Sequence, residues 1–199
     1  ASRGFPGVGR SWGGWLTPLP KESLAAYATR MREQIPEERP LLMGLSFGGI
    51  MCTEIAKQIP VDHIILISSI KTAAELPFWM RAVARLSLHK IFPLKSTPFT
   101  APLQNHFLGV TNDFDKRIAQ AYRKAADPQY VRWAVDHIVN WKNRASYPRI
   151  SHIHGDKDRI FPLKHIHADH VISGGGHFMI MNRAREVSQC IHTVLTGHP

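Results

Sequence analysis

A five-residue turn, Gly44-Leu45-Ser46-Phe47-Gly48, constrains the fold of this chain more than any other segment. It follows the apolar run Leu41-Leu42-Met43 and precedes a run of helical character from Gly48 to Gln58. This G-x-S-x-G pattern is typical of a sharp strand-to-helix turn, because Gly44 and Gly48 let the strand and the helix approach closely. We therefore expect a strand from Pro40 to Leu45, a helix after it, and a serine hydroxyl displayed at the turn.

Strand-like and helix-like segments alternate on both sides of a long helical region. Residues 71–147 show several helical stretches and no strand alternation, whereas His63 to Ser68 has the apolar pattern of a strand buried on both faces. This order predicts an α/β fold, a mostly parallel sheet flanked by helices, in one domain of residues 1–199 with residues 71–147 inserted as a helical lid. The other expected elements are helices over 21–34, 48–58 and 183–195 and strands over 149–154 and 168–173.

The composition is that of a globular domain, since 44% of the 199 residues are hydrophobic and 20% are charged. No apolar stretch approaches the roughly 18 residues that a membrane span needs, and no signal-peptide pattern is visible at the N-terminus. The two cysteines, Cys52 and Cys190, fall in expected helices. We interpret them as buried thiols rather than a disulfide, which favours a reducing compartment and a cytoplasmic location.

Two later segments supply an acid and a base. His154-Gly155-Asp156-Lys157-Asp158 follows one expected strand, and Gly174-Gly175-Gly176-His177 follows another. A histidine on a flexible turn at the carboxyl end of a strand can reach a serine on a neighbouring strand, and a neutral imidazole near pH 7 is suited to accept the serine proton. Asp156 and Asp158 are both candidates for the acid that orients His177.

The order serine, aspartate, histidine, each in its expected context, resembles that of the α/β-hydrolase-fold serine hydrolases over roughly residues 15–195. The segment from His154 to Pro162 is similar to the family's H-G-x-x-D-x-x-x-P pattern, and by that match Asp158 is the acid and Asp156 shapes the loop. The resemblance implies a catalytic triad of Ser46, Asp158 and His177. It also implies an esterase- or lipase-like hydrolase without a cofactor, which cleaves carboxylic esters or thioesters through a covalent acyl-enzyme.

The backbone N–H of Phe47 is the natural oxyanion donor, because the start of the expected helix directs free N–H groups at the serine. Family members usually begin with two or three more strands and a His-Gly loop that supplies a second donor, and no His-Gly dipeptide precedes Pro40 here. One interpretation is that Gly7-Val8-Gly9 or Trp12-Gly13-Gly14 supplies a substitute loop. The other is that the chain is a natural truncation or a fragment that lacks the first strands. The alternative is a catalytically weak or inactive α/β-hydrolase-fold binding protein. A missing edge strand would also favour a homodimer.

A second motif, His165-Ile166-His167-Ala168-Asp169-His170, resembles the zinc-binding signature of metallo-β-lactamase-fold hydrolases. In that family the signature lies early and further ligands follow it, whereas here it lies close to the end of the chain. The α/β interpretation needs a helix start and a strand in the same segment. We therefore expect no functional metal site, and metal-dependent hydrolysis through His165, His167 and His170 is the alternative.

The positive charge is concentrated in the expected lid. Residues 71–150 hold 13 Lys and Arg and 5 Asp and Glu, a net +8 of the chain's formal +10. One interpretation is a core-facing apolar stripe with a solvated basic face. The other is an anionic partner at the lid: a lipid–water interface, a negatively charged acyl substrate or an acyl-carrier protein. Nucleic acid is not expected, because no binding motif accompanies the charge. We expect four aromatic residues of the lid to shape an apolar acyl pocket: Phe78, Trp79, Phe107 and Trp133.

Overall fold

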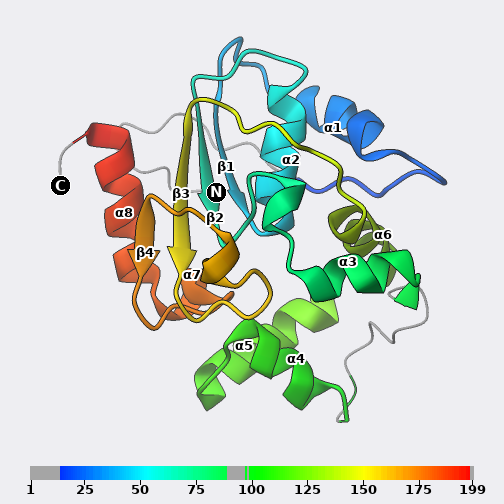
Figure 1. Ribbon diagram of the computed structural model, residues 1–199, viewed down its shortest axis with the longest axis vertical. Coiled ribbons are helices and arrows are strands. Elements are labelled where there is room, and N and C mark those ends of the chain that lie inside the picture. Colours follow the sequence, from blue (N-terminus) through cyan, green and yellow to red (C-terminus); the bar gives the residue numbers. More distant parts are fainter. Residues whose placement is uncertain (1–13, 89–96, 98, 198–199) are drawn as a thin grey trace.

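The structure, a computed structural model, describes residues 14–88, 97 and 99–197. Its centre is a sheet of four strands: β1 (Leu41–Leu45), β2 (His63–Ile67), β3 (Ile150–Gly155) and β4 (His170–Ile172). The strands follow one another in the sheet in their chain order, and every neighbouring pair is parallel (Figure 1). The expected α/β fold with a parallel sheet is confirmed.

Helices outside the region between β2 and β3 cover both faces of the sheet (Figure 1). On one face lie α1 (Leu24–Arg32) and α2 (Phe47–Ala56). On the other face lies α8 (Ala184–Thr196), which follows the short helix α7 (Met179–Asn182). A connection through a helix is what parallel neighbouring strands require, and α2 provides it between β1 and β2.

The central strand β2 is buried on both faces. Its residues Ile64 and Leu66 pack in the core formed with α1 and α2. Ile65 and Ile67, which alternate with them, pack with Val187 of α8 in a second core. A strand between two helical layers has no polar side, which explains the continuous apolar run in the sequence.

Between β2 and β3 the chain forms a helical region, which we call the insertion (residues 71–147). Figure 1 shows its helices α4 and α5 beyond the carboxyl ends of the strands, and α6 beside α3. The role of the insertion as a lid stays a prediction. Its described residues form a 3-10 turn (Ala73–Glu75) and the helices α3 (Phe78–Arg85), α4 (Ala101–Leu108), α5 (Asp113–Ala125) and α6 (Pro128–Val139).

Side-chain caps decide where several helices begin. The Ser23 hydroxyl accepts the N–H of Ala26 at 3.2 Å, so α1 begins at Leu24 and not at Lys21 as the apolar pattern predicts. Asn112 caps α5 in the same way. A capping residue is polar and is not part of the apolar repeat. Periodicity alone therefore misplaces a helix start by a few residues.

The last strand is shorter than the sequence predicts. The backbone N–H of His152 donates to the carboxylate of Asp169 at 2.7 Å, and the N–H of Asp169 donates to the carbonyl of His152 at 2.9 Å. A side chain thus takes the place that a strand carbonyl would occupy in the ladder. β4 therefore begins only at His170 and covers 170–172 instead of 168–173.

Strand β1 forms one edge of the described sheet, with β2 as its neighbour. Three apolar side chains of β1 are exposed by 38% to 44%, whereas Leu42 between them is buried. The backbone groups of alternate residues on that edge have no neighbouring strand within the described sheet. The homodimer expected from an open edge stays a prediction. The exposed side chains are those of Leu41, Met43 and Leu45.

Both cysteines are free thiols. Cys52 is buried in α2, and burial raises the pKa of its thiol to about 12. In the described ranges, no helix is both long enough and apolar enough to cross a membrane. A cytoplasmic location stays a prediction.

Candidate active site

Ser46 lies on the turn between β1 and α2 in a strained backbone conformation, with φ 52° and ψ −117°. The turn is held at both sides: the Ser46 N–H donates to the carbonyl of Ile67 at 2.9 Å, and the hydroxyl of Ser69 donates to the Ser46 carbonyl at 2.6 Å. A Cβ on Gly44 would overlap the backbone of Gly48. Gly44 is therefore required for the close approach of strand and helix, as the sequence predicts.

The expectation that Gly48 is required in the same way is wrong. Among the described residues, a Cβ on Gly48 would meet only the ring of Trp15, at 3.8 Å, which is an ordinary contact. The crowded position is the next one, because a Cβ on Gly49 would overlap the Ser69 side chain and come within 2.9 Å of Leu66. The helix thus approaches the sheet most closely at Gly49.

Three side chains from distant parts of the chain form one hydrogen-bonded series. Ser46 Oγ lies 2.8 Å from His177 Nε2, and His177 Nδ1 lies 2.8 Å from Asp158 Oδ2. An ionised carboxylate only accepts, so His177 carries its proton on Nδ1 and presents the lone pair of Nε2 to the serine hydroxyl. Asp158 is 4% exposed and His177 7%, which keeps bulk water away from this pair.

The structure distinguishes the two candidate acids. Asp158 Oδ1 accepts the backbone N–H groups of Ile160 at 2.8 Å and Phe161 at 2.9 Å, which leaves Oδ2 directed at His177. Asp156 instead accepts the backbone N–H of Gly174 at 2.7 Å. Asp158 therefore contacts His177, and Asp156 joins the two loops.

The loop that carries His177 packs on its neighbours through backbone. A Cβ on Gly155 would overlap the carbonyl of Gly175, and that carbonyl accepts the Lys157 N–H at 2.8 Å. On the other side, the N–H of Phe178 donates to the carbonyl of Leu108, the last residue of α4, at 2.9 Å. A Cβ on Gly175 or on Gly176 would lie 3.0 Å from neighbouring backbone, so these two glycines allow close packing, whereas Gly174 adopts φ 69°.

Phe47 is the first residue of α2, so its N–H has no carbonyl one turn earlier within the helix. Its ring is buried between Trp15 at 5.8 Å and Trp133 at 5.7 Å. This packing fixes the peptide group whose N–H was predicted to bind an oxyanion. Gly7-Val8-Gly9 lies outside the described residues, as do Trp12 and Gly13 of the second predicted substitute loop.

The four aromatic residues predicted for an acyl pocket separate in the structure. The rings of Trp79 and Phe107 lie 5.9 Å apart. Phe78 is 75% exposed. Trp133 packs on Phe47 and donates its indole N–H to the carbonyl of Glu22 at 3.0 Å, so it belongs to the support of the α2 turn. Of the four, the structure brings Trp79 and Phe107 together.

The histidine-rich motif is divided between two elements. His165 ends a 3-10 turn and His170 begins β4. Asp169 bonds the backbone of His152 and lies 3.7 Å from the ammonium group of Lys71. Among the described residues, no three His, Cys, Asp or Glu side chains are grouped so that they could hold a metal ion.

Two buried histidines that the sequence analysis gave no role lie behind Asp158. His152 and His154 occupy alternate positions of β3 and therefore point to the same face of the sheet. Both are fully buried, and His154 Nε2 lies 3.5 Å from Asp158 Oδ2. The signal in the sequence is the spacing: two histidines two residues apart in a strand that ends at the acid loop.

Comparison with known proteins places the chain in a family. The chain belongs to the alpha/beta hydrolase family, whose model matches residues 4–189. An uncharacterized protein of Mycobacterium tuberculosis, Rv2715, is 27% identical and covers 81% of this chain. The chain spans 58% of the length of that relative.

Solved structures share the fold at low identity. The meta-cleavage product hydrolase of Pseudomonas fluorescens IP01 has a TM-score of 0.60 and 17% identity, over 87% of this chain and 70% of that one. An esterase from Thermogutta terrifontis has a TM-score of 0.59 and 19% identity, over 87% of this chain and 72% of that one. These likenesses extend to the architecture of the sheet and its helices.

Proposed function

We propose that this protein is a serine hydrolase that cleaves carboxylic esters or thioesters through an acyl-enzyme intermediate. The observation that carries the proposal is the series from Ser46 to His177 to Asp158, with 2.8 Å at each step. Membership of the alpha/beta hydrolase family supports a hydrolase, and the esterase among the similar structures supports ester substrates.

In the first half of the proposed reaction, Ser46 Oγ attacks the acyl carbon while His177 Nε2 takes the hydroxyl proton. Asp158 Oδ2 holds the proton on Nδ1 and stabilises the imidazolium that forms. The proton on Nε2 then passes to the leaving alcohol or thiol. The products of this half are the free alcohol or thiol and an ester of Ser46.

In the second half, a water molecule gives a proton to His177 Nε2 as its oxygen attacks the same acyl carbon. The carboxylic acid leaves, and the proton returns to Ser46. The negative oxygen formed in each half is stabilised by the N–H of Phe47, at the positive end of α2. A single donor of this kind is worth about 10²–10³ in turnover.

The aromatic pair Trp79 and Phe107 is the proposed wall for the acyl chain. Both side chains are only partly buried, and Phe107 lies in α4, whose last carbonyl bonds the segment next to His177. Phe78 and Trp133 contribute less on this proposal, because the first is exposed and the second supports Phe47. Apolar rings next to the segment that carries His177 would favour an apolar acyl chain over a charged one.

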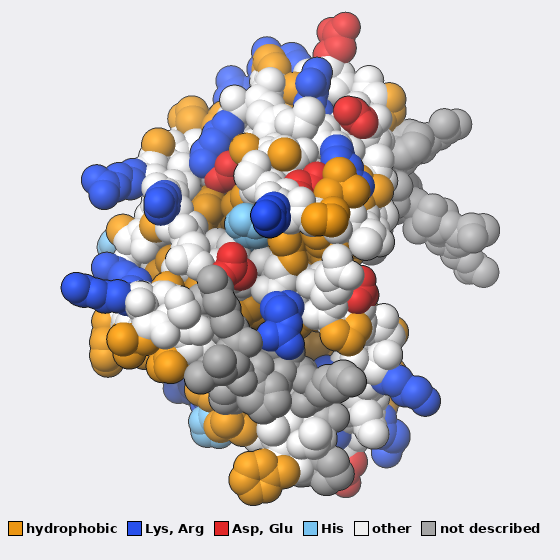
Figure 2. Space-filling model, turned by 90° about the vertical axis from the view of Figure 1, so that its right-hand side faces the viewer, with side chains coloured by type: hydrophobic (Ala, Val, Ile, Leu, Met, Phe, Trp, Pro, Cys, Tyr) orange, Lys and Arg blue, Asp and Glu red, His pale blue; other side chains and the backbone are white. Residues whose placement is uncertain are grey.

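An anionic group on the substrate or its carrier is the proposed partner of the insertion. On the face drawn in Figure 2, Lys and Arg side chains are spread among apolar and acidic ones. A groove of about 630 Å³ is lined by Arg81, Lys142 and Arg144, with no carboxylate among its lining residues. We propose this groove as the place for the anionic group, because three cations attract it without a competing acid.

The test of the proposed function combines a fluorophosphonate probe with p-nitrophenyl esters of several chain lengths. We expect the probe to label the wild-type protein at Ser46, and the variants Ser46→Ala and His177→Ala to show neither labelling nor turnover above background. Ser146→Ala and His192→Ala, at exposed positions, are the matched controls and should behave as wild type. Equal labelling of Ser46→Ala and wild type would refute the proposal.

Labelling without measurable turnover of any ester would support the alternative, a catalytically weak or inactive binding protein. Activity that EDTA abolishes would support metal-dependent hydrolysis through His165, His167 and His170 instead. Both outcomes differ from the expected one, which is EDTA-resistant turnover that requires Ser46.

A further inference from the structure

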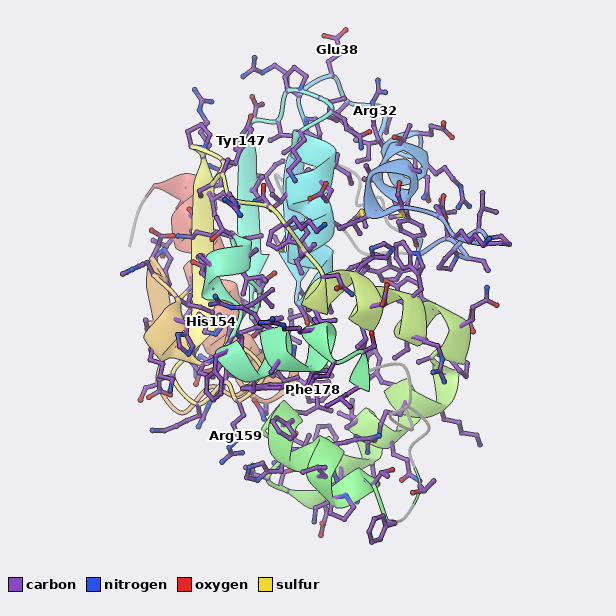
Figure 3. All side chains as sticks on the ribbon, turned by 45° about the vertical axis from the view of Figure 1, so that its right-hand side comes forward. Arg32, Glu38, Tyr147, His154, Arg159 and Phe178 are labelled. Atoms are coloured by element: carbon purple, nitrogen blue, oxygen red, sulfur yellow. The ribbon has the colours of Figure 1, made fainter. Side chains whose placement is uncertain are left out.

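The two buried histidines of β3 contact each other directly. His152 Nε2 lies 3.2 Å from His154 Nδ1, and the two ring planes are nearly perpendicular, at 86°. On its other side, His154 Nε2 lies 2.8 Å from the carbonyl oxygen of Phe161. Figure 3 shows His154 on β3, above Arg159 and Phe178 in this view.

The chemistry of these partners fixes the position of the protons. A carbonyl oxygen only accepts, so His154 donates from Nε2 to Phe161. Burial lowers the pKa of His154, which keeps the ring neutral and leaves a lone pair on Nδ1. His152 must then donate from its own Nε2 to that lone pair. His154 is thus held as a neutral ring with its proton on Nε2.

Phe161 is bonded at both of its backbone groups. Its N–H donates to Asp158 Oδ1 at 2.9 Å, and its carbonyl accepts from His154 at 2.8 Å. Its ring, which is fully buried, lies 5.6 Å from the His177 ring. The turn from Asp158 to Phe161 is therefore held by two hydrogen bonds. One joins the Phe161 N–H to the Asp158 carboxylate, and the other joins the Phe161 carbonyl to His154 of β3.

We propose that His154 is a positioning residue for Asp158, acting by its hydrogen bond to the Phe161 carbonyl and by the 3.5 Å approach of its Nε2 to Asp158 Oδ2. This inference rests on the proposed function, because it assigns His154 a role in the same site. Without the bond, the 160–161 amides would no longer hold Oδ1 in one place, and Oδ2 would lose its alignment with His177.

The variants His154→Met and His154→Gln separate this role from a purely structural one. Methionine fills similar space without a donor, whereas glutamine carries an amide N–H that can reach a carbonyl. We expect His154→Met to lower kcat by about 10- to 100-fold with KM within about threefold, because misalignment acts on the chemical step. We expect His154→Gln to restore kcat to within about fivefold of wild type.

The control is Ile153→Ala, a fully buried residue of the same strand that points to the opposite face. It should lower the unfolding temperature by as much as His154→Met and leave kcat within about twofold of wild type. Equal losses of kcat in both variants would mean that His154 only stabilises β3, which overturns the inference. So would a His154→Met enzyme with wild-type kcat.

A measurement on the wild-type protein covers the case in which His154→Met does not fold. Long-range ¹H–¹⁵N NMR of the histidine rings should show His154 as the neutral Nε2–H form at pH 7. An Nδ1–H form or a charged ring would overturn the inference. If the wild-type protein is not labelled at Ser46, the proposed function fails. If Ser46 is labelled but the kcat values of the variants or the proton position on His154 differ from those expected, only the role of His154 is refuted.

Discussion

Gly109 and Gly176 face each other across the contact between the insertion and the loop that carries His177. A Cβ on Gly109 would come within 2.9 Å of the Gly176 α-carbon, and a Cβ on Gly176 within 3.0 Å of the Gly109 α-carbon. Beside them, the guanidinium of Arg159 donates to the carbonyl of His106 at 2.8 Å. The insertion therefore contacts both loops that carry the proposed acid and base.

Gly109→Ala should impair the site from a distance. Gly109 ends α4 with φ 71°, a conformation that alanine disfavours, and the added methyl group would press on the segment before His177. We expect the rate of fluorophosphonate labelling of Ser46 to fall by about tenfold or more, because a displacement of His177 by a fraction of an ångström misaligns the proton transfer.

Gly197→Ala is the matched control for that variant. Gly197 ends α8 with φ 68°, and a Cβ there would meet no described residue within 4 Å. It should lose about 1–2 kcal/mol of stability from the left-handed backbone conformation and label at the wild-type rate. If both variants label normally, the contact between Gly109 and Gly176 has no bearing on the site.

Much of the fold is predictable from the sequence, because a short apolar run such as His63 to Ser68 in a globular chain indicates a strand that is buried on both faces. The choice of Asp158 over Asp156 followed from the spacing of a known pattern. The crowding at Gly49 and the pairing of His152 with His154 were not predictable, since both depend on which residues of other elements lie opposite. The packing of Trp133 on Phe47 was not predictable for a similar reason, because aromatic residues pack equally well beside a substrate and beside another ring.

Gly49→Ala and Gly48→Ala should differ in stability although they are neighbours. The methyl group at Gly49 would overlap Ser69, whereas at Gly48 it would only touch Trp15. We expect Gly49→Ala to lower the free energy of unfolding by about 1–3 kcal/mol through overpacking. Gly48→Ala should change it by less than about 1 kcal/mol. Urea unfolding of both variants checks this, and equal losses would contradict it.

Acid should weaken the fold through His152. Burial lowers the pKa of His152 to about 3, whereas an unfolded histidine titrates near 6.5. Between these values the unfolded chain binds a proton that the folded chain does not. The contribution of neutral His152 to the free energy of unfolding is therefore complete above about pH 6.5. Below that pH it declines by about 1.4 kcal/mol per pH unit.

His152→Leu removes that contribution to the pH dependence. The free energy of unfolding, measured in urea between about pH 4 and pH 6, should then vary less steeply by about 1.4 kcal/mol per pH unit. His192→Gln, at an exposed position, is the control and should keep the wild-type slope. A slope that stays the same in His152→Leu would mean that this ring accepts a proton in the folded protein.

Charge reversal in the groove of the insertion tests the proposed anionic partner. Lys142→Glu combined with Arg144→Glu should raise KM for an ester with a carboxylate on its leaving group by about tenfold, and leave KM for a neutral ester unchanged. Arg185→Glu, exposed on α8, is the control for a change of net charge. Added salt should raise KM for the anionic ester of the wild-type protein. Equal effects on both esters would refute the role of the groove.

The side of β1 that no strand of the described sheet covers also has a practical consequence for handling the protein. An extended segment that lies along this side can gain main-chain hydrogen bonds and cover Leu41, Met43 and Leu45 at once. Self-association should therefore grow with protein concentration, and Met43→Lys should suppress it in light scattering while Leu195→Lys, on α8, should not. We therefore expect this border of the described sheet to be where aggregation starts in concentrated solutions.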